Sequence, residues 1–292
     1  MFTVITPYIF ENEIKNIQRL APWQLDWIFE EDIGRIGPDM MYQKMWNECD
    51  EDIFIFHSDM EPVSGHEIWW DKVQHYADSY PEAGILGCKL LYPLCNENQK
   101  YYIECAGGKF ENNKPDHYGS GIEIGSRVTF KTPEVDEGQY DYVREVAWYT
   151  FGGIFIRRQV LNEVGSFDAT FEWSYNRDVD FCLRTRELGW KIYQIPVPLF
   201  HYQSKDIKRI KTEENANAEA RNLIRLQNKW QNSPFYQTIG KRIEKETESQ
   251  KPGEYQRSKP TTVAPTPKNM GISKNQSSKW QKIANIPEEK FE

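Results

Sequence analysis

A chain of 292 residues with a formal charge of −8 is long enough for one large domain or two modest ones. The acidic balance argues against a general nucleic-acid-binding protein, which would carry a basic face, and is compatible with an anionic ligand held through a metal ion. No stretch is long and apolar enough for a membrane-spanning helix, and the N-terminal MFTVITPYIF lacks the basic head and long apolar run of a signal peptide.

The cysteines indicate a reducing compartment. They are odd in number, widely scattered and without a CxxC pair, so the sequence supports neither a zinc knuckle nor a disulfide framework. The five are Cys49, Cys88, Cys95, Cys105 and Cys182. A cytoplasmic protein is the simplest expectation.

The first hundred residues alternate between apolar strands and helical patterns. Short apolar runs predict strands, the first of which ends at Pro7. Strands are expected over 1–6, 26–32, 52–56 and 83–93, and helices over 38–48 and 66–80. This alternation predicts an α/β fold with a mostly parallel, Rossmann-like central sheet flanked by helices.

The pattern continues less regularly along the rest of the chain. Residues 93–145 are rich in Gly, Asn, Asp and Tyr, and we expect loops and short strands there. The elements expected after them are a strand within 147–158, a helix over 158–164 closed by Gly165, a helix over 178–188 closed by Gly189, a strand over 191–197 and a helix over 213–230.

The sequence changes character near its C-terminal end. Beyond about residue 245 it is rich in Pro, Ser, Thr, Lys and Gln and too poor in apolar residues to offset the entropy of ordering, which predicts disorder. The predicted organisation is therefore one folded domain over residues 1–235, followed by a short helical extension and a disordered tail over 236–292.

The stretch FIFHSDMEP, residues 54–62, places polar side chains directly after a buried strand. Residues two apart on an extended segment point the same way, so His57 and Asp59 could face one ion. Asp59 suits a hard or borderline cation such as Mg²⁺ or Mn²⁺, and Mn²⁺ tolerates imidazole better. On spacing alone, a strand-end loop with two solvated side chains is the simpler interpretation. His201 follows the strand at 191–197. It is a candidate metal ligand only if it lies beside Asp59.

Two carboxylates, Asp178 and Asp180, stand at the start of the helix in RDVDFCLRTRELG. The helix dipole and the free backbone N–H groups favour acidic residues there without any function. Positions two apart on a helix are roughly opposite, so only one of them can face a given site. Asp180 can pair on the surface with Arg184, four residues later, which leaves Asp178 as the candidate general base. The glycine-rich CAGG and FGG lack the spacing of a P-loop or a dinucleotide fingerprint, and we expect no cofactor role for them.

Five segments, in their order along the chain, resemble glycosyltransferase family 2, in particular its rhamnosyltransferase-like members with a GT-A fold. The resemblance covers roughly residues 1–230, is strongest over 147–204, and rests on the order of the segments more than on any one. The segments are FIFHSDMEP, AGILGCKLLYP, IECAGGKF, VAWYTFGGIFIRRQVLNEVGSFDATFE and RDVDFCLRTRELGWKIYQIPVPLFHYQS.

The resemblance implies that residues 1–235 form a GT-A catalytic domain. Its expected activity is transfer of a sugar from a nucleotide-sugar donor to a hydroxyl of a glycan or another acceptor, as in polysaccharide biosynthesis. A divalent ion, Mn²⁺ or Mg²⁺, neutralises the charge on the diphosphate leaving group. A carboxylate takes the proton of the acceptor hydroxyl, and a single displacement inverts the anomeric carbon.

The resemblance also implies roles for individual residues. Asp178 matches the catalytic base, and Asp59 and His201 match the metal ligands. His57 stands where the metal motif has its first carboxylate; it would bind the ion directly, hold a metal-bound water or only contact the donor. The residues matched to donor binding are Thr6, Pro7, Glu30, Asp32 and Asp59.

The chain departs from the family pattern at three places. His57 replaces the first carboxylate of the metal motif, and Arg177-Asp178 replaces the usual Glu-Asp before the helix. The segment EEDIGRIG (30–37), at the end of the second strand, lacks the usual Asp-x-Ser. These departures keep a second function open, that of a non-catalytic glycan- or nucleotide-binding protein with a degenerate GT-A site. A metal-dependent nuclease or nucleotidyltransferase would also use carboxylates and a metal, but the acidic composition argues against it.

Overall fold

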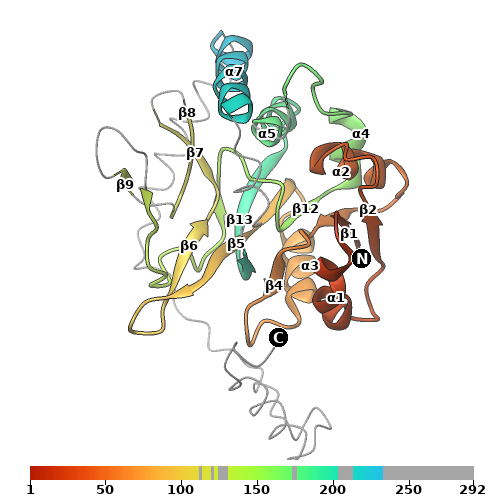
Figure 1. The fold of residues 1–292 in the computed structure, drawn as a ribbon, viewed down its shortest axis with the longest axis vertical. Helices are drawn as coiled ribbons and strands as arrows, with labels where there is room; N and C mark the ends of the chain where they lie inside the picture. The colour runs from red at the N-terminus through yellow and green to blue at the C-terminus, as the bar shows by residue number, and fades with distance from the viewer. Residues whose placement is uncertain (112–113, 120–121, 124–130, 173–175, 203–212, 233–292) are drawn as a thin grey trace, which may run out of the picture. The chain divides into compact units, whose positions relative to one another are not determined.

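The computed structural model describes residues 1–111, 114–119, 122–123, 131–172, 176–202 and 213–232. Within these residues, nine strands form one mixed sheet with helices packed around it (Figure 1). The strands are β1 (Thr3–Tyr8), β2 (Trp27–Glu31), β3 (Ile53–Ile55), β4 (Met60–Pro62), β5 (Ala83–Cys95), β6 (Tyr101–Cys105), β11 (Arg144–Glu145), β12 (Ile154–Ile156) and β13 (Lys191–His201). Their order is β11-β13-β5-β12-β3-β1-β2, with β4 beside β13 and β6 beside β5.

Five strands of the sheet run in the same direction. β1 pairs in parallel with β2 and β3, and β13 pairs in parallel with β5. β12 lies between β3 and β5 and is antiparallel to both, so these two also share one direction. The sheet is therefore mostly parallel in its core, as the strand–helix alternation predicted. The carboxyl ends of β1, β2, β3, β5 and β13 lie at one edge, where open α/β sheets place their binding sites.

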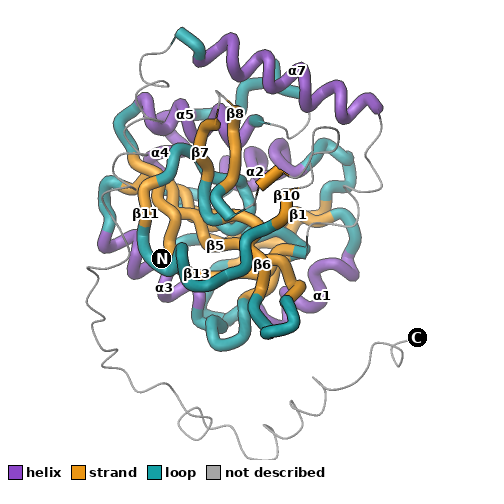
Figure 2. Tube along the Cα trace, turned by 90° about the vertical axis from the view of Figure 1, so that its left-hand side faces the viewer, coloured by secondary structure: helices purple, strands orange, loops and turns teal. Residues whose placement is uncertain are grey.

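The helices are α1 (Glu11–Leu20), α2 (Pro38–Asn47), α3 (Trp69–Ser79), α4 (Arg158–Val164), α5 (Arg177–Glu187) and α7 (Glu213–Trp230). α1 and α2 pack on β1, α3 packs on β5 and β13, and α5 packs on β13. Figure 2 shows α7 lying along one end of the domain, next to α5. Two hairpins, β7 (Gly108–Glu111) with β8 (Lys114–His117) and β9 (Ile122–Glu123) with β10 (Lys131–Thr132), lie outside the sheet.

The core combines the sheet with aromatic side chains from the helices. Trp69 of α3 lies against Phe54 and Phe56, with ring centroids 4.6 Å and 5.3 Å away. Phe2 and Phe155 extend this cluster across the neighbouring strands. The continuous apolar run at 53–56 is thus buried in full, as its sequence predicted, and the chain becomes polar only where β3 reaches the edge of the sheet.

Several element boundaries differ from those predicted. β1 continues through Pro7 to Tyr8, because β3 pairs with β1 only as far as Ile5 and the proline needs no ladder bond on that side. The strand expected within 147–158 is only Ile154–Ile156, since Gly152 and Gly153 break the extended chain, with φ of 68° at Gly153. α1 was not predicted; among its described side chains, Ile14 and Ile17 are the buried ones.

The helix expected over 158–164 is present and ends before Gly165, which has a positive φ of 73°. The strand expected over 191–197 is longer than predicted and extends to His201. Among the described residues, none of the helices has the length and apolarity needed to cross a lipid bilayer. The predicted extension and tail over 236–292 lie outside the residues that the structure describes.

Candidate active site

His57, Asp59 and His201 lie together at the carboxyl edge of the sheet. His57 follows the end of β3 by two residues, and Asp59 directly precedes β4. β4 pairs antiparallel with the end of β13, with Met60 opposite His201, and the backbone N–H of Tyr202 donates to the carbonyl of Asp59 at 2.9 Å. This pairing brings two segments far apart in the sequence into contact and places His201 beside Asp59.

Each of the three side chains contributes one atom to a compact set of possible metal ligands. Nε2 of His201 lies 3.3 Å from Oδ1 of Asp59. Nδ1 of His57 lies 3.4 Å from that nitrogen and 4.0 Å from the same oxygen. Ligands that bind one ion at about 2.0–2.6 Å have separations of this order. The set, one carboxylate oxygen and two imidazole nitrogens within 4.8 Å of one another, fits a divalent ion.

The side chain of His57 is held by its neighbours. Its Nε2 lies 3.0 Å from the carbonyl oxygen of Phe151 and 2.7 Å from the hydroxyl of Tyr42. A carbonyl oxygen can only accept, so Nε2 carries the hydrogen and Nδ1 keeps the lone pair that faces the cluster. Tyr42 also stacks on the imidazole, with 6° between the ring planes. Gly152 packs against the same ring: a Cβ there would lie 2.8 Å from Cε1 of His57.

A carboxylate orients His201 in the corresponding way. Nδ1 of His201 lies 2.8 Å from each oxygen of Glu104, on β6. A carboxylate accepts hydrogen bonds, so Nδ1 carries a hydrogen and Nε2 is the nitrogen that faces Asp59. Carboxylate–histidine pairs of this kind fix the tautomer of metal-binding histidines. Tyr42, Glu104 and the Phe151-Gly152 pair were not among the predicted site residues.

The two histidines have opposite pKa shifts. Burial, with the charge of His201, lowers the pKa of His57 to about 4. Burial also acts to lower the pKa of His201, but its hydrogen bonds with Asp59 and Glu104 raise it to about 10. At neutral pH, His57 is therefore neutral and His201 is protonated. An ion that binds Nε2 of His201 has to displace a proton, so metal affinity should fall as the pH decreases.

Asp178 lies in the first turn of α5. The backbone N–H of Val179 donates to Oδ1 of Asp178 at 2.8 Å, which favours the ionised carboxylate. Burial has the larger effect and raises the pKa of Asp178 to about 7, although part of the residue remains exposed. A general base works best with a pKa near the working pH, so this carboxyl has the proton affinity that such a role requires.

Tyr42 interacts with His57 and with the charge of Asp178. Its hydroxyl contacts His57, and burial raises its pKa well above the usual value. The charges of Asp39, Asp59 and Asp178 raise that pKa further, because all three carboxylates lie close enough to oppose ionisation of the phenol. The two predicted functional groups, at the end of β3 and at the start of α5, thus share one electrostatic neighbourhood.

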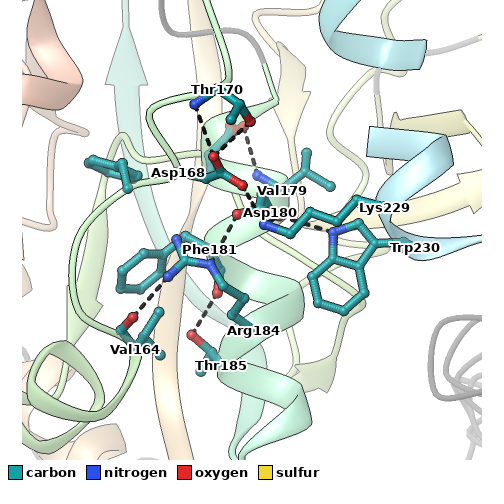
Figure 3. Close-up of polar contacts among 12 residues, drawn as sticks. Val164, Asp168, Thr170, Val179, Asp180, Phe181, Arg184, Thr185, Lys229 and Trp230 are labelled. Carbon is teal, nitrogen blue, oxygen red and sulfur yellow. Dashed lines mark hydrogen bonds and ion pairs between the residues drawn. The ribbon is translucent and has the colours of Figure 1, made fainter. Parts of the chain in front are cut away.

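Asp180 has a different environment from Asp178. The predicted pair with Arg184 is present, at 3.0 Å from Nε, but it is not on the surface because Asp180 is fully buried. Figure 3 shows the carboxylate of Asp180 enclosed by Arg184, Lys229 and Trp230. Nζ of Lys229 lies 2.7 Å from Oδ1, and Nε1 of Trp230 donates to the same oxygen at 3.0 Å. Lys229 also reaches Asp168 at 2.6 Å. Asp180 therefore attaches α7 to α5.

The residues expected to bind the donor lie at the ends of β1 and β2. Oγ1 of the fully buried Thr6 donates to the carbonyl of Phe56 at 2.7 Å. Both oxygens of Asp32 accept backbone N–H groups, from Ile36 and Gly37, at 2.9 Å. The remaining two are Glu30, which pairs with Lys44, and Pro7, which is opposite Glu30 in the sheet. Thr6 and Asp32 thus shape the backbone at this edge.

No protein-family model matches the sequence, and no curated protein is similar enough to count as a relative. Solved structures do resemble the fold. GalNAc-T7, whose crystal structure contains UDP, GalNAc and Mn²⁺, aligns with a TM-score of 0.50 and 9% identity, over 85% of this chain and 55% of that one. A197 from STIV aligns with a TM-score of 0.40 and 12% identity, over 70% of this chain and 87% of that one. The likeness to GalNAc-T7 shows a glycosyltransferase-like α/β fold of the GT-A type.

Proposed function

We propose that this chain is an inverting glycosyltransferase of family 2, related to its rhamnosyltransferase-like members. It would transfer a sugar from a nucleotide-sugar donor to a hydroxyl of a glycan or another acceptor, as in polysaccharide biosynthesis. The observation that carries the proposal is the convergence of Asp59 and His201, with His57, at the carboxyl edge of the sheet. The raised pKa of Asp178, in the same electrostatic neighbourhood, supports it.

In this proposal, Oδ1 of Asp59, Nε2 of His201 and Nδ1 of His57 would hold a divalent ion, Mn²⁺ or Mg²⁺. A bound ion of this kind supplies Lewis-acid neutralisation of the charge on a diphosphate leaving group. Glu104 and Tyr42 keep the two imidazoles in the orientation that this requires.

Asp178 would act as the general base. The oxygen of the acceptor hydroxyl forms a bond to the anomeric carbon of the donor sugar, and the bond from that carbon to the diphosphate oxygen breaks. The bonding electron pair leaves with the diphosphate, and the hydroxyl proton passes to the carboxylate of Asp178. One displacement of this kind inverts the anomeric configuration, and no second nucleophile is needed.

The donor would lie along the ends of β1 and β2. Thr6, Pro7, Glu30 and Asp32 would line its nucleotide side, and Asp59 would connect that side to the metal. We further propose that residues 1–235 are the catalytic domain and that the protein works in the cytoplasm, as its cysteine content suggests.

A second candidate function has support from particular contacts. Arg177, which replaces an acidic residue of the family pattern, bonds the carbonyl of Phe171 at 2.6 Å and lies 3.8 Å from Asp39. Asp32 and Thr6 are engaged with the backbone. Such a site could bind a nucleotide or a glycan without transferring a sugar.

A panel of nucleotide sugars separates these functions. The full chain would be mixed with each donor, with Mn²⁺ or with a chelator, and its melting temperature measured, since a specific ligand raises apparent stability by mass action. If the protein is a glycosyltransferase, one class of donor should raise the melting temperature only when the metal is present. The protein should then also release nucleoside diphosphate from that donor in a Mn²⁺-dependent reaction. Stabilisation without any release of nucleoside diphosphate favours the non-catalytic function. No stabilisation by any donor contradicts the glycosyltransferase proposal and nucleotide binding alike.

A further inference from the structure

His57 introduces a nitrogen ligand at the end of β3 that changes the chemistry of the cluster. With Nδ1 of His57 and Nε2 of His201 facing Asp59, two of the three protein ligands are imidazole nitrogens and one is a carboxylate oxygen. Whether Nδ1 of His57 can bind an ion depends on which of the two ring nitrogens carries the hydrogen.

The contacts of His57 do fix that nitrogen. The carbonyl of Phe151 requires the hydrogen on Nε2, and Tyr42 stacks on the ring, so rotation of the imidazole would lose both contacts. Gly152 lies so close to the ring that any side chain there would displace it. Glu104 fixes the second imidazole in the same sense. Both imidazoles are thus held with Nδ1 of His57 and Nε2 of His201 facing Asp59.

A site of this composition discriminates between divalent ions. Mg²⁺ prefers oxygen ligands in near-ideal octahedral geometry and gives up its water reluctantly. Imidazole suits first-row transition ions, whose affinity for nitrogen ligands increases from Mn²⁺ onward along the series. The composition of the site favours the same ions, because Asp59 is the single carboxylate among the three ligands.

We infer that His57 sets the metal selectivity of this site: by binding through Nδ1, it makes a two-imidazole, one-carboxylate site that takes Mn²⁺ or a later first-row divalent ion in preference to Mg²⁺. The inference rests on the metal role proposed above, which allowed Mn²⁺ or Mg²⁺, and restricts the bound ion to the first-row divalent transition metals. Tyr42 and Glu104 act as positioning residues in this arrangement.

The test compares Mn²⁺ and Mg²⁺ binding to the chelator-treated full chain by isothermal titration calorimetry, without donor. The wild type should bind Mn²⁺ at least about tenfold more tightly than Mg²⁺. His57→Asp supplies oxygen and charge in place of nitrogen and should lower this ratio by about tenfold or more. His75→Asp makes the same change at an exposed histidine on α3 and should leave the ratio unchanged.

Several outcomes overturn the inference. Equal wild-type affinities for the two ions contradict it even if His57→Asp does not fold. A folded His57→Asp protein, checked by circular dichroism, with an unchanged ratio also contradicts it. His201→Ala separates this failure from that of the proposed function. If His201→Ala abolishes Mn²⁺ binding while His57→Asp changes nothing, the metal site stands and only the role of His57 fails. If no ion binds the wild type, the metal role itself is wrong.

Discussion

Nδ1 of His201 donates a hydrogen bond that both carboxylate oxygens of Glu104 share, each at 2.8 Å. The contact joins the last residue of β13 to β6, on the side of the imidazole that faces away from Asp59. Together with the hydrogen bond to Asp59, it raises the pKa of His201, and it leaves Nε2 facing Asp59. Its importance can be measured without knowing the donor or the acceptor.

Glu104→Gln is expected to weaken Mn²⁺ binding by about 10- to 100-fold, because residues that orient metal-binding histidines contribute that much. The amide keeps an oxygen acceptor but loses the charge that makes His201 a stronger ligand. Glu97→Gln changes an exposed glutamate in the same way and is the matched control. Calorimetric titration with Mn²⁺ measures both, and equal dissociation constants in the two variants would argue against the orienting role of Glu104.

The pH dependence of transfer should follow Asp178. A base has to be deprotonated to accept a proton, and burial gives this carboxyl a pKa of about 7. With donor and metal saturating, kcat should therefore be low at acidic pH and rise to a plateau, with its midpoint near that value. A rate profile measured over this range in the wild type would disagree with the assignment if it stayed flat.

The same group affects stability. The folded-state pKa of Asp178 lies above its unfolded value, so the native protein binds more protons between the two pKa values, and the free energy of unfolding falls as the pH rises through that window. Asp178→Asn removes the cost of an ionised buried carboxyl. It should unfold at a higher temperature than the wild type at about pH 8, and this difference should disappear towards about pH 4. Thermal unfolding at both pH values checks the sign.

Lys229→Ala tests the attachment of α7 to α5. The substitution leaves the buried carboxylate of Asp180 with one partner fewer, so the free energy of unfolding should decrease by about 1–3 kcal/mol. Lys100 pairs with Glu137 where both side chains are largely exposed. Lys100→Ala should cost only about 0–1 kcal/mol. Urea denaturation of both variants measures the contrast, and similar losses would mean that the contacts drawn in Figure 3 contribute little.

The local parts of this structure could be predicted from the sequence. The apolar run at 53–56 correctly predicted a buried strand. The extended segment expected through His57 and Asp59 is instead a turn at residues 58–59, where the N–H of Met60 donates to the carbonyl of His57 at 3.2 Å, so their two-residue spacing does not explain why they lie together. The amphipathic pattern of α2 and the acidic start of α5 likewise predicted these two helices. Each of these predictions depends on residues within about one element of each other, which is the range over which periodicity carries information.

The contacts that complete the site could not be predicted in that way. Tyr42 comes from α2 and Glu104 from β6, and only the pairing of distant strands brings them against His57 and His201. The burial of Asp180 depends on α7, some 50 residues further along the chain. An (i, i+4) spacing predicts its pair with Arg184 correctly but carries no information about what covers that pair.

The most direct test of the account is sugar transfer by Asp178→Asn, once a stabilising donor has been found. The variant should keep Mn²⁺-dependent stabilisation by that donor, since Asp178 is not among the proposed metal ligands. Transfer to the acceptor, measured by release of nucleoside diphosphate at about pH 8, should fall by roughly two orders of magnitude or more, because the acceptor hydroxyl loses its base. Turnover close to that of the wild type would contradict the account, since no carboxyl at position 178 would then be needed.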